Sequence, residues 1–427
     1  MSETAQSPIR TALAGLIGNV LEWFDFAVYG YLNTQIGDTF FTGYDADERK
    51  ELAFAVFALG FVARPLGSIV LGRVGDRIGR RALLTLSICL MGGSTLAIGL
   101  LPSYTQIGVA APLLLIAMRV IQGFSLGGEF TGSMVYTTEL ASPMLRGLIS
   151  SSTAAGTSLG FILGSGVVYS VKQSMDDAAL ADWGWRLPFI ISVVFCIAGY
   201  FLRHGIVEPD TTAKAKAKEQ EEHAHWFKSI ARDWRPIVQT FGIVGMTNAA
   251  YYLTFTFATE QRASELPARP DADSFLLVNV CVLFLVLASK PFGGWLSDKL
   301  GRRRLMMTIQ VVAMALIYPA TRLMMTGSPA VFACGQLLLA IPLGMALGLQ
   351  GAMLVEIFPL RSRVMSMSLA YSGTLALAGG IAPLLATWMT KHLHDPVSPA
   401  YFVLAHGVVG FIIMLGMKET NTNSLLE

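Results

Sequence analysis

The chain has 427 residues, of which 53% are hydrophobic and only 14% are charged, and its formal net charge is +2. A soluble domain carries roughly a quarter charged residues, so this composition excludes an ordinary soluble protein. The four cysteines lie scattered through apolar segments without ligand spacing, which indicates neither a disulfide framework nor a metal site. Because no nucleotide-binding loop or catalytic motif is present, we expect no cofactor, no nucleic-acid partner, no ATP-driven pump and no enzyme.

Twelve apolar segments long enough to cross a bilayer follow one another along the chain. We place them at 10–37, 51–74, 82–102, 107–135, 145–171, 183–205, 236–262, 273–296, 303–325, 329–355, 363–391 and 398–417. The first contains Glu22 and Asp25 and lacks a small-residue cleavage site. We therefore expect it to remain in the mature protein rather than to act as a signal peptide. The predicted fold class is an all-α integral membrane protein with twelve transmembrane helices.

The longest hydrophilic stretch lies between the sixth and seventh spans. It divides the chain into an N-terminal six-helix bundle (1–206), a cytoplasmic linker (207–235) and a C-terminal six-helix bundle (236–427). The short loops after the second and eighth spans are rich in Arg and Lys, whereas those after the first and fifth are acidic. Basic loops face the cytoplasm, so both termini are predicted to be cytoplasmic, in a bacterial-type inner membrane.

The two halves carry related signatures. The loop Gly72–Arg81 reads GRVGDRIGRR, and Gly294–Arg303 reads GWLSDKLGRR. Asp76 and Asp298 are 222 positions apart, and the acidic residues that end the fourth and tenth spans, Glu139 and Glu356, are 217 apart. Similar offsets predict two pseudo-symmetric halves, a common design of secondary transporters.

Ionisable residues within the membrane are costly and point to function. Glu22, Asp25 and Tyr29 recur at i, i+3 and i+7 of the first span and therefore share one helix face. Either Glu22 or Asp25 is a candidate proton carrier next to a substrate site, and Tyr29 is a candidate ligand in that site. The alternative is a structural ion pair with a neighbouring arginine.

The fourth span carries Arg119, Gln122 and Glu129. Arg119 is a candidate to bind a substrate carboxylate or to pair with the proton-binding carboxylate, because a guanidinium stays charged and binds carboxylates bidentately. With the offset of 217, the three positions map onto Gln336, Leu339 and Ala346 in the second half. Because the second half lacks these charged residues, a functional role is favoured over a helix-packing salt bridge. We predict that Gln122 belongs to the substrate site and that Glu129 takes part in proton coupling.

Arg64 and Lys290 each precede a proline in the second and eighth spans. Both are predicted to make a central cavity cationic, with snorkelling toward headgroups as the alternative. In the seventh span, Asn248, Tyr251 and Tyr252 share a helix face and are predicted to line the same cavity. Aromatic faces also bind quaternary ammonium groups. The alternative is that these aromatic residues serve only to pack the protein core.

Several stretches carry a resemblance to a known family. They are the two loop signatures, Arg119–Gly123, Gly18–Phe26, Arg64–Gly67, Gln122–Glu129 and Trp183–Phe189. The chain resembles the major facilitator superfamily and, within it, the metabolite:proton symporters, which include transporters of proline and betaine, citrate, 2-oxoglutarate and shikimate. The resemblance implies the major facilitator fold and transport by alternating access. The C-terminal coiled coil of the family's proline/betaine osmosensor has no counterpart before Glu427, so we do not expect that form of osmotic regulation.

The resemblance also implies two gating clusters, in which the loop Asp caps a helix of the other half and the loop Arg pairs with the acidic residue that ends the fourth or tenth span. Carried over residue by residue, one cluster would be Asp76, Arg80 and Glu139. The other would be Asp298, Arg302 and Glu356.

We therefore predict a proton-coupled symporter that works as a monomer in the lipid bilayer. The candidate cavity cations favour a small organic acid with one to three carboxylates as the imported substrate. The alternative substrate is a zwitterionic osmolyte such as proline or betaine. The family resemblance alone favours protons over sodium ions as the coupling ion. The alternative from another functional class is a membrane sensor that does not transport, which would require an added signalling domain.

Overall fold

The computed structural model describes residues 8–78, 80–127, 129–204, 231–265, 271–360 and 362–421, and every regular element among them is helical. Each predicted span corresponds to one helix or to consecutive helical segments. The N-terminal half comprises α1 (Pro8–Tyr31), α2 (Asn33–Phe40), α3 (Ala46–Ile78), α4 (Arg80–Leu100), α5 (Tyr104–Ile107), α6 (Ala110–Ser125), α7 (Glu129–Glu139), α8 (Arg146–Ser174), α9 (Asp177–Asp182) and α10 (Leu187–His204). Short turns of 3₁₀ helix, Pro143–Leu145 and Gly184–Arg186, precede α8 and α10.

The C-terminal half is built in the same way. It comprises α13 (Trp234–Tyr252), α14 (Ala258–Glu265), α15 (Asp271–Leu300), α16 (Arg302–Thr326), α17 (Pro329–Ile357), α18 (Arg363–Leu375), α19 (Ala382–Leu393) and α20 (Pro399–Leu415). Two π-helical turns, η3 (Leu253–Phe257) and η4 (Ala376–Gly380), join α13 to α14 and α18 to α19. Most of the predicted linker lies outside the described residues.

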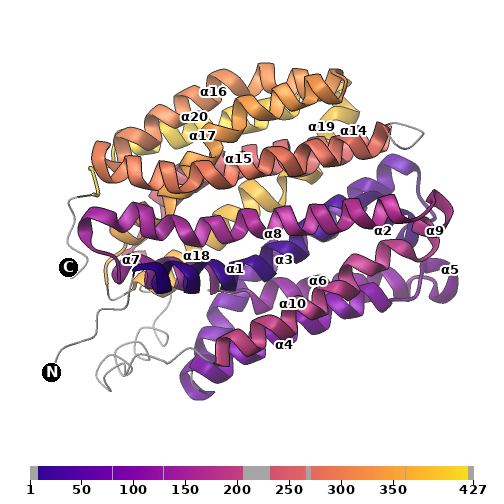
Figure 1. Cartoon of the computed structure of the whole chain (residues 1–427), viewed down its shortest axis with the longest axis horizontal. Coiled ribbons are helices and arrows are strands. Elements are labelled where there is room, and N and C mark those ends of the chain that lie inside the picture. The colour runs from indigo at the N-terminus through magenta and orange to yellow at the C-terminus, as the bar shows by residue number, and fades with distance from the viewer. Residues whose placement is uncertain are drawn as a thin grey trace.

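The two halves lie one above the other, with the helices roughly along one direction (Figure 1). α8 and α15 run side by side at the boundary between the halves. Seven helical stretches of the described residues are long and apolar enough to cross a bilayer, and three shorter apolar helices accompany them. Together with the solved structures reported below, this arrangement confirms the predicted twelve-helix fold.

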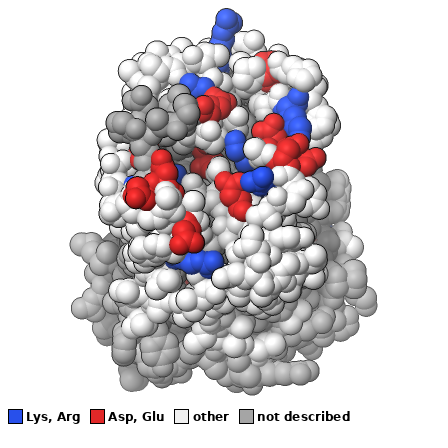
Figure 2. Space-filling model, turned by 90° about the vertical axis from the view of Figure 1, so that its right-hand side faces the viewer, with Lys and Arg blue, Asp and Glu red and all other residues white. Residues whose placement is uncertain are grey.

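Two loops define the ends of the molecule used below. The basic-loop end is the end where α15 passes into α16 at Gly301, and α1 also begins there. The opposite end carries the loop 41–45 and the segment Asp176–Asp182. Figure 2 views this opposite end, where acidic and basic side chains lie next to one another among uncharged residues.

Glycines allow close helix crossings, which hold membrane bundles together where lipid removes the hydrophobic driving force. A Cβ on Gly123 of α6 would lie 1.8 Å from the Gly60 carbonyl oxygen of α3. Between the halves, a Cβ on Gly147 of α8 would lie 2.4 Å from the Gly294 oxygen of α15. The halves are therefore in backbone contact at the basic-loop end.

Candidate functional site

A small enclosed space, called the central cavity below, lies between the two halves. Its aromatic lining consists of Trp23, Phe130, Phe161, Tyr251, Tyr252 and Tyr371. Its polar side chains are Thr157, Asn248 and Gln350, and Ala154 and Leu347 complete the lining. The volume is about 20 Å³, enough for about one water molecule. The cavity is therefore closed around its aromatic walls.

The aromatic walls come from both halves and touch one another. The ring centroids of Phe161 and Tyr251 are 5.2 Å apart, and those of Phe130 and Tyr371 are 5.1 Å apart. Within the N-terminal half, the ring centroid of Trp23 lies 6.0 Å from that of Phe161. Opening the cavity to a substrate therefore requires the two halves to separate the Phe161–Tyr251 and Phe130–Tyr371 pairs.

Four polar atoms of the cavity lining are buried without a hydrogen-bond partner among the described residues. They are Trp23 Nε1, Tyr251 Oη, Tyr252 Oη and Gln350 Oε1. Buried polar groups are almost always hydrogen-bonded in folded proteins, and leaving one without a partner costs about 1–3 kcal/mol. Three donors and an acceptor in one aromatic cavity are the arrangement expected of a site that bonds to a polar ligand.

Glu22 and Arg64 form a buried ion pair beside this cavity. Arg64 Nη1 lies 2.8 Å from Glu22 Oε1, and both side chains are about 98% buried or more. The Arg64 guanidinium also lies 5.3 Å from the Trp23 ring centroid and 4.6 Å from that of Phe26. The pair therefore lies behind Trp23 and does not itself line the cavity.

Asp25 belongs to a separate hydrogen-bonded chain. Thr95 Oγ1 donates to Asp25 Oδ2 at 2.6 Å, and Gln122 Nε2 donates to Thr95 Oγ1 at 2.6 Å. Arg119 Nη1 in turn donates to Gln122 Oε1 at 2.9 Å. The carboxylate and the guanidinium are thus linked through two neutral side chains instead of pairing directly.

The guanidinium of Arg119 is held by aromatic rings as well. It lies 4.3 Å from the ring centroid of Tyr29 and 4.7 Å from that of Phe26, and the Tyr29 hydroxyl donates to the Ala53 carbonyl at 3.2 Å. Phe26 therefore contacts both Arg64 and Arg119. Its ring separates the Glu22–Arg64 ion pair from the hydrogen-bonded chain that begins at Asp25.

Of the predicted substrate ligands, Asn248, Tyr251 and Tyr252 line the central cavity. Arg64, Arg119, Gln122, Tyr29 and Lys290 do not. Lys290 lies behind the wall, where its Nζ donates to the Ala154 carbonyl at 2.6 Å and to Thr157 Oγ1 at 2.8 Å. Glu129 is half-buried at the start of α7.

Thr95 and Gln350 are site residues that the sequence analysis missed. Each is a polar side chain in an otherwise apolar stretch, and both are nearly inaccessible to solvent. A single buried polar residue in a membrane span was the available signal, but threonine and glutamine are too common for that signal to be selective.

The basic-loop end is closed by contacts between the halves. Asp298 Oδ1 accepts from Gly147 N at 2.8 Å and Oδ2 from Leu148 N at 3.0 Å, so the carboxylate of α15 caps the first turn of α8. Arg302 bonds to Asp298 at 2.7 Å and to Glu356 at 3.2 Å. The structure thus brings the three residues of the second predicted cluster together.

Of the first predicted cluster, the structure describes the side chain of Glu139. The side chains of Asp76 and Arg80 lie outside the described residues. Glu139 bonds to Arg363 Nη1 of the other half at 2.6 Å. This pair adds a second connection between the halves at the basic-loop end.

The opposite end is closed too. Glu260 Oε1 accepts from the backbone N–H and the hydroxyl of Thr34 at 3.0 and 2.6 Å. The Tyr31 hydroxyl donates at 2.8 Å to the carbonyl of Phe255, which lies in the π-helical turn η3. Because contacts between the halves close both ends, the structure is an occluded state.

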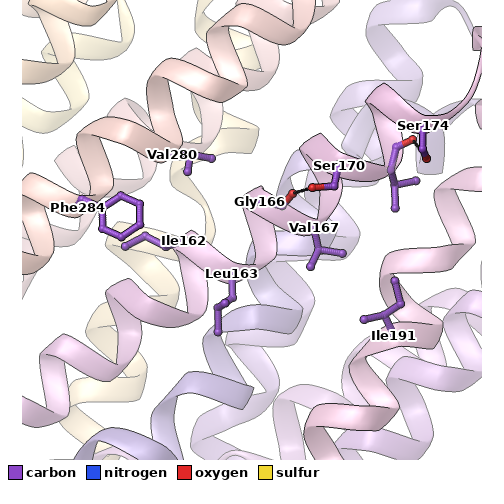
Figure 3. Close-up of a pocket in the computed structure, with 10 residues that line it drawn as sticks. Ile162, Leu163, Gly166, Val167, Ser170, Ser174, Ile191, Val280 and Phe284 are labelled. Carbon is purple, nitrogen blue, oxygen red and sulfur yellow. Dashed lines mark hydrogen bonds between the residues drawn. The ribbon is translucent and has the colours of Figure 1, made fainter.

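A larger groove lies elsewhere, between α8, α10 and α15, and has a volume of about 610 Å³ (Figure 3). Its lining is apolar except for Ser170 and Ser174, whose hydroxyls donate to carbonyls of their own helix. Phe284 and Leu163 line it and are 54% and 38% exposed. A surface without convergent polar groups does not fit a polar substrate, so we do not place the site here.

Known proteins give an independent comparison. A family model described as "Sugar (and other) transporter" matches residues 11–427. The proline/betaine transporter of Escherichia coli K12 is 34% identical over 98% of this chain and 85% of its own length. The glycine betaine/proline/ectoine/pipecolic acid transporter OusA of Dickeya dadantii is 32% identical over the same shares.

Solved structures show the same fold. The partially occluded, inward-open xylose transporter XylE of E. coli superimposes with a TM-score of 0.77 over 98% of this chain and 99% of that one, at 18% identity. The human organic anion transporter MFSD10 gives a TM-score of 0.62 at 17% identity, over 96% of this chain and 99% of that one. With transporters matching along nearly its whole length, the chain is a multi-pass inner-membrane protein that belongs to the sugar (and other) transporter family of the major facilitator superfamily.

Proposed function

We propose that this protein is a proton-coupled symporter that imports a small zwitterionic osmolyte such as proline or betaine. The observation that carries the proposal is the central cavity, whose walls are six aromatic rings with four unpartnered polar atoms among the described residues. Aromatic faces attract substituted ammonium groups, and the polar atoms suit a small carboxylate or a bound water. The names of the curated relatives favour the same class.

The organic acid that the sequence analysis favoured finds less support in this geometry. It required Arg64, Arg119 and Lys290 to present free cations to the substrate. Arg64 is paired with Glu22, Arg119 is bonded to Gln122, and none of the three cations lines the cavity. A di- or tricarboxylate would bring net negative charge into an aromatic cavity without a lining cation, which is costly.

For proton coupling we favour Asp25 over Glu22. Protonation of Glu22 would leave Arg64 buried without its counter-charge, and breaking a buried pair in this way costs about 3–5 kcal/mol. Asp25 can take up a proton and keep its hydrogen bond to the Thr95 hydroxyl. Through Gln122, the change in charge would reach Arg119 and loosen the packing of α1 against α6.

In alternating access, the two closed ends would open one at a time. We place the basic-loop end in the cytoplasm, by the positive-inside rule, and the opposite end outside. Separation of Thr34 from Glu260 would admit substrate and proton. Separation of Asp298 from α8 would release them.

Uptake into liposomes tests the proposal. Purified protein should accumulate labelled betaine or proline when an inward proton gradient is imposed, and citrate and 2-oxoglutarate should neither accumulate nor compete. A matched sodium gradient without a proton gradient should be ineffective. Accumulation of an organic acid with the zwitterions inert would overturn the substrate class, and uptake indifferent to the proton gradient would overturn the coupling.

A further inference from the structure

Lys290 places an amino group behind one wall of the central cavity. It lies on α15, is 0% exposed, and among the described residues donates to two neutral oxygens of α8. No carboxylate of the described residues lies within ion-pair distance of its Nζ. Burial of an ammonium group without a counter-ion is expensive, so the charged form of Lys290 is favoured only while a negative partner is close by.

The two residues whose oxygens bind Lys290 belong to the cavity lining. Thr157 and Ala154 both line the central cavity, and the Thr157 hydroxyl donates to the Ala154 carbonyl at 2.7 Å while it accepts from Lys290. The Lys290 amino group is therefore one hydrogen bond away from two residues that line the cavity.

The aromatic part of the cavity begins one helical turn away. Phe161 follows Thr157 by four residues on α8 and so shares its face. Its ring centroid lies 5.2 Å from that of Tyr251, 6.2 Å from Tyr252 and 6.0 Å from Trp23. One side of the cavity thus suits an onium group, and the neighbouring side has an amino group that a carboxylate would hold in its charged form, which together complement a zwitterion.

We propose that Lys290 is the specificity-determining residue that admits zwitterions and rejects cations carrying the same onium group. The carboxylate of the substrate would face Thr157 and Lys290, and its onium group would face the rings. A trimethylammonium compound without a carboxylate would gain no attraction to the Lys290 ammonium and would be repelled by it. This inference rests on the proposed function, since it presumes a zwitterionic substrate.

Competition against labelled betaine uptake in liposomes tests it, with betaine, choline and betaine methyl ester as competitors. The ester keeps the trimethylammonium group and nearly the shape of betaine but lacks the negative charge. In the unmodified protein we expect betaine to compete at least about tenfold better than either cation, since two like charges in one cavity repel by roughly ten- to hundredfold in affinity at an effective dielectric constant near 20.

Lys290→Met should weaken betaine and strengthen choline, so that their ratio falls about tenfold or more toward one. Lys290→Gln, which keeps a donor for the two α8 oxygens, should change the ratio in the same direction and replaces Lys290→Met if that variant does not fold. Lys299→Met is the matched control, because it removes one charge from an exposed position of the same helix and should leave the ratio unchanged.

Betaine uptake with an unchanged ratio in folded Lys290 variants would overturn the role of Lys290 and leave the proposed function standing. Equal competition by betaine and its methyl ester in the unmodified protein would also overturn it. If no zwitterion is taken up at all, the proposed function fails together with this inference.

Discussion

Asp298→Ala should open the basic-loop end of the molecule. The carboxylate accepts two backbone hydrogen bonds from the first turn of α8, at 2.8 and 3.0 Å, and its side chain is 96% buried. Hydrogen bonds to a charged group contribute about 1.5–3 kcal/mol each. Arg302 keeps Glu356 as a partner, so the substitution does not leave that guanidinium without a counter-charge.

Because the two bonds share one carboxylate and are not additive, we expect the closed arrangement to lose about 2–4 kcal/mol. At 1.4 kcal/mol per factor of ten, the population open at this end should rise by about 30- to 700-fold. Asp298→Asn, which keeps one acceptor oxygen but no charge, should give an intermediate rise.

The assay is the labelling rate of a cysteine buried between the halves. Ser151 is 1% exposed and lies against Gly294, so Ser151→Cys should react slowly with a water-soluble maleimide until the end opens. The four native cysteines would first be replaced. Ser192→Cys, also 1% exposed but within the N-terminal half, reports unfolding rather than opening.

Faster labelling at residue 151, with no change at residue 192, is the expected result. Glu139→Gln provides a comparison, because its partner Arg363 is buried but the Glu139 side chain is 37% exposed. Exposed ion pairs contribute about 1 kcal/mol or less, so labelling should rise only a few-fold. An unchanged rate in Asp298→Ala would refute the assignment of this cap as the closing contact.

Three further predictions concern coupling, packing and the C-terminal segment. Asp25→Asn should abolish proton-driven accumulation in liposomes but retain exchange of internal for external substrate; loss of both would argue against a coupling role. Gly123→Leu should lower the thermal midpoint by several degrees or prevent folding, because its Cβ would lie 1.8 Å from a backbone oxygen, whereas Gly132→Ala, with nothing within 4 Å, should not. Burial raises the pKa of Glu419, but the backbone N–H groups at the start of α16 that donate to its carboxylate outweigh this effect and lower it. Because the pKa of Glu419 is lowered in the folded protein, its carboxylate stabilises the fold above the unfolded-state pKa near 4.3, and this stability is lost as the pH falls further. Glu419→Gln should therefore be less stable than the original protein by about 1 kcal/mol at neutral pH and should approach its stability at acidic pH. Equal thermal midpoints of the two proteins at neutral pH would contradict this.

The sequence alone determined the membrane-spanning architecture. Apolar runs of about 20 residues can bury their backbone polar groups in lipid only as helices, so the spans could be placed from composition. The repeated signatures at Asp76 and Asp298 indicated two related halves. Arg119 and Gln122, three residues apart on one helix, were predicted to act together, and their hydrogen bond follows from helix geometry.

Only the tertiary structure decided which groups meet across helices. The periodicity of α1 put Glu22 and Asp25 on one face, yet Glu22 pairs with Arg64 and Asp25 bonds to Thr95. Several arginines of neighbouring spans could have paired with either carboxylate. The choice depends on helix rotation and on crossings set by glycine contacts, which no local pattern encodes.

The same holds for the cavity. Lys290 and Thr157 lie on helices of different halves, 133 positions apart, and Trp23 and Gln350 are still farther apart in the chain. Whether Lys290 lines the cavity or lies behind its wall depends on how closely α15 packs against α8. That distance is set by the Gly147–Gly294 contact and the Asp298 cap, and these form only when the two halves are packed together.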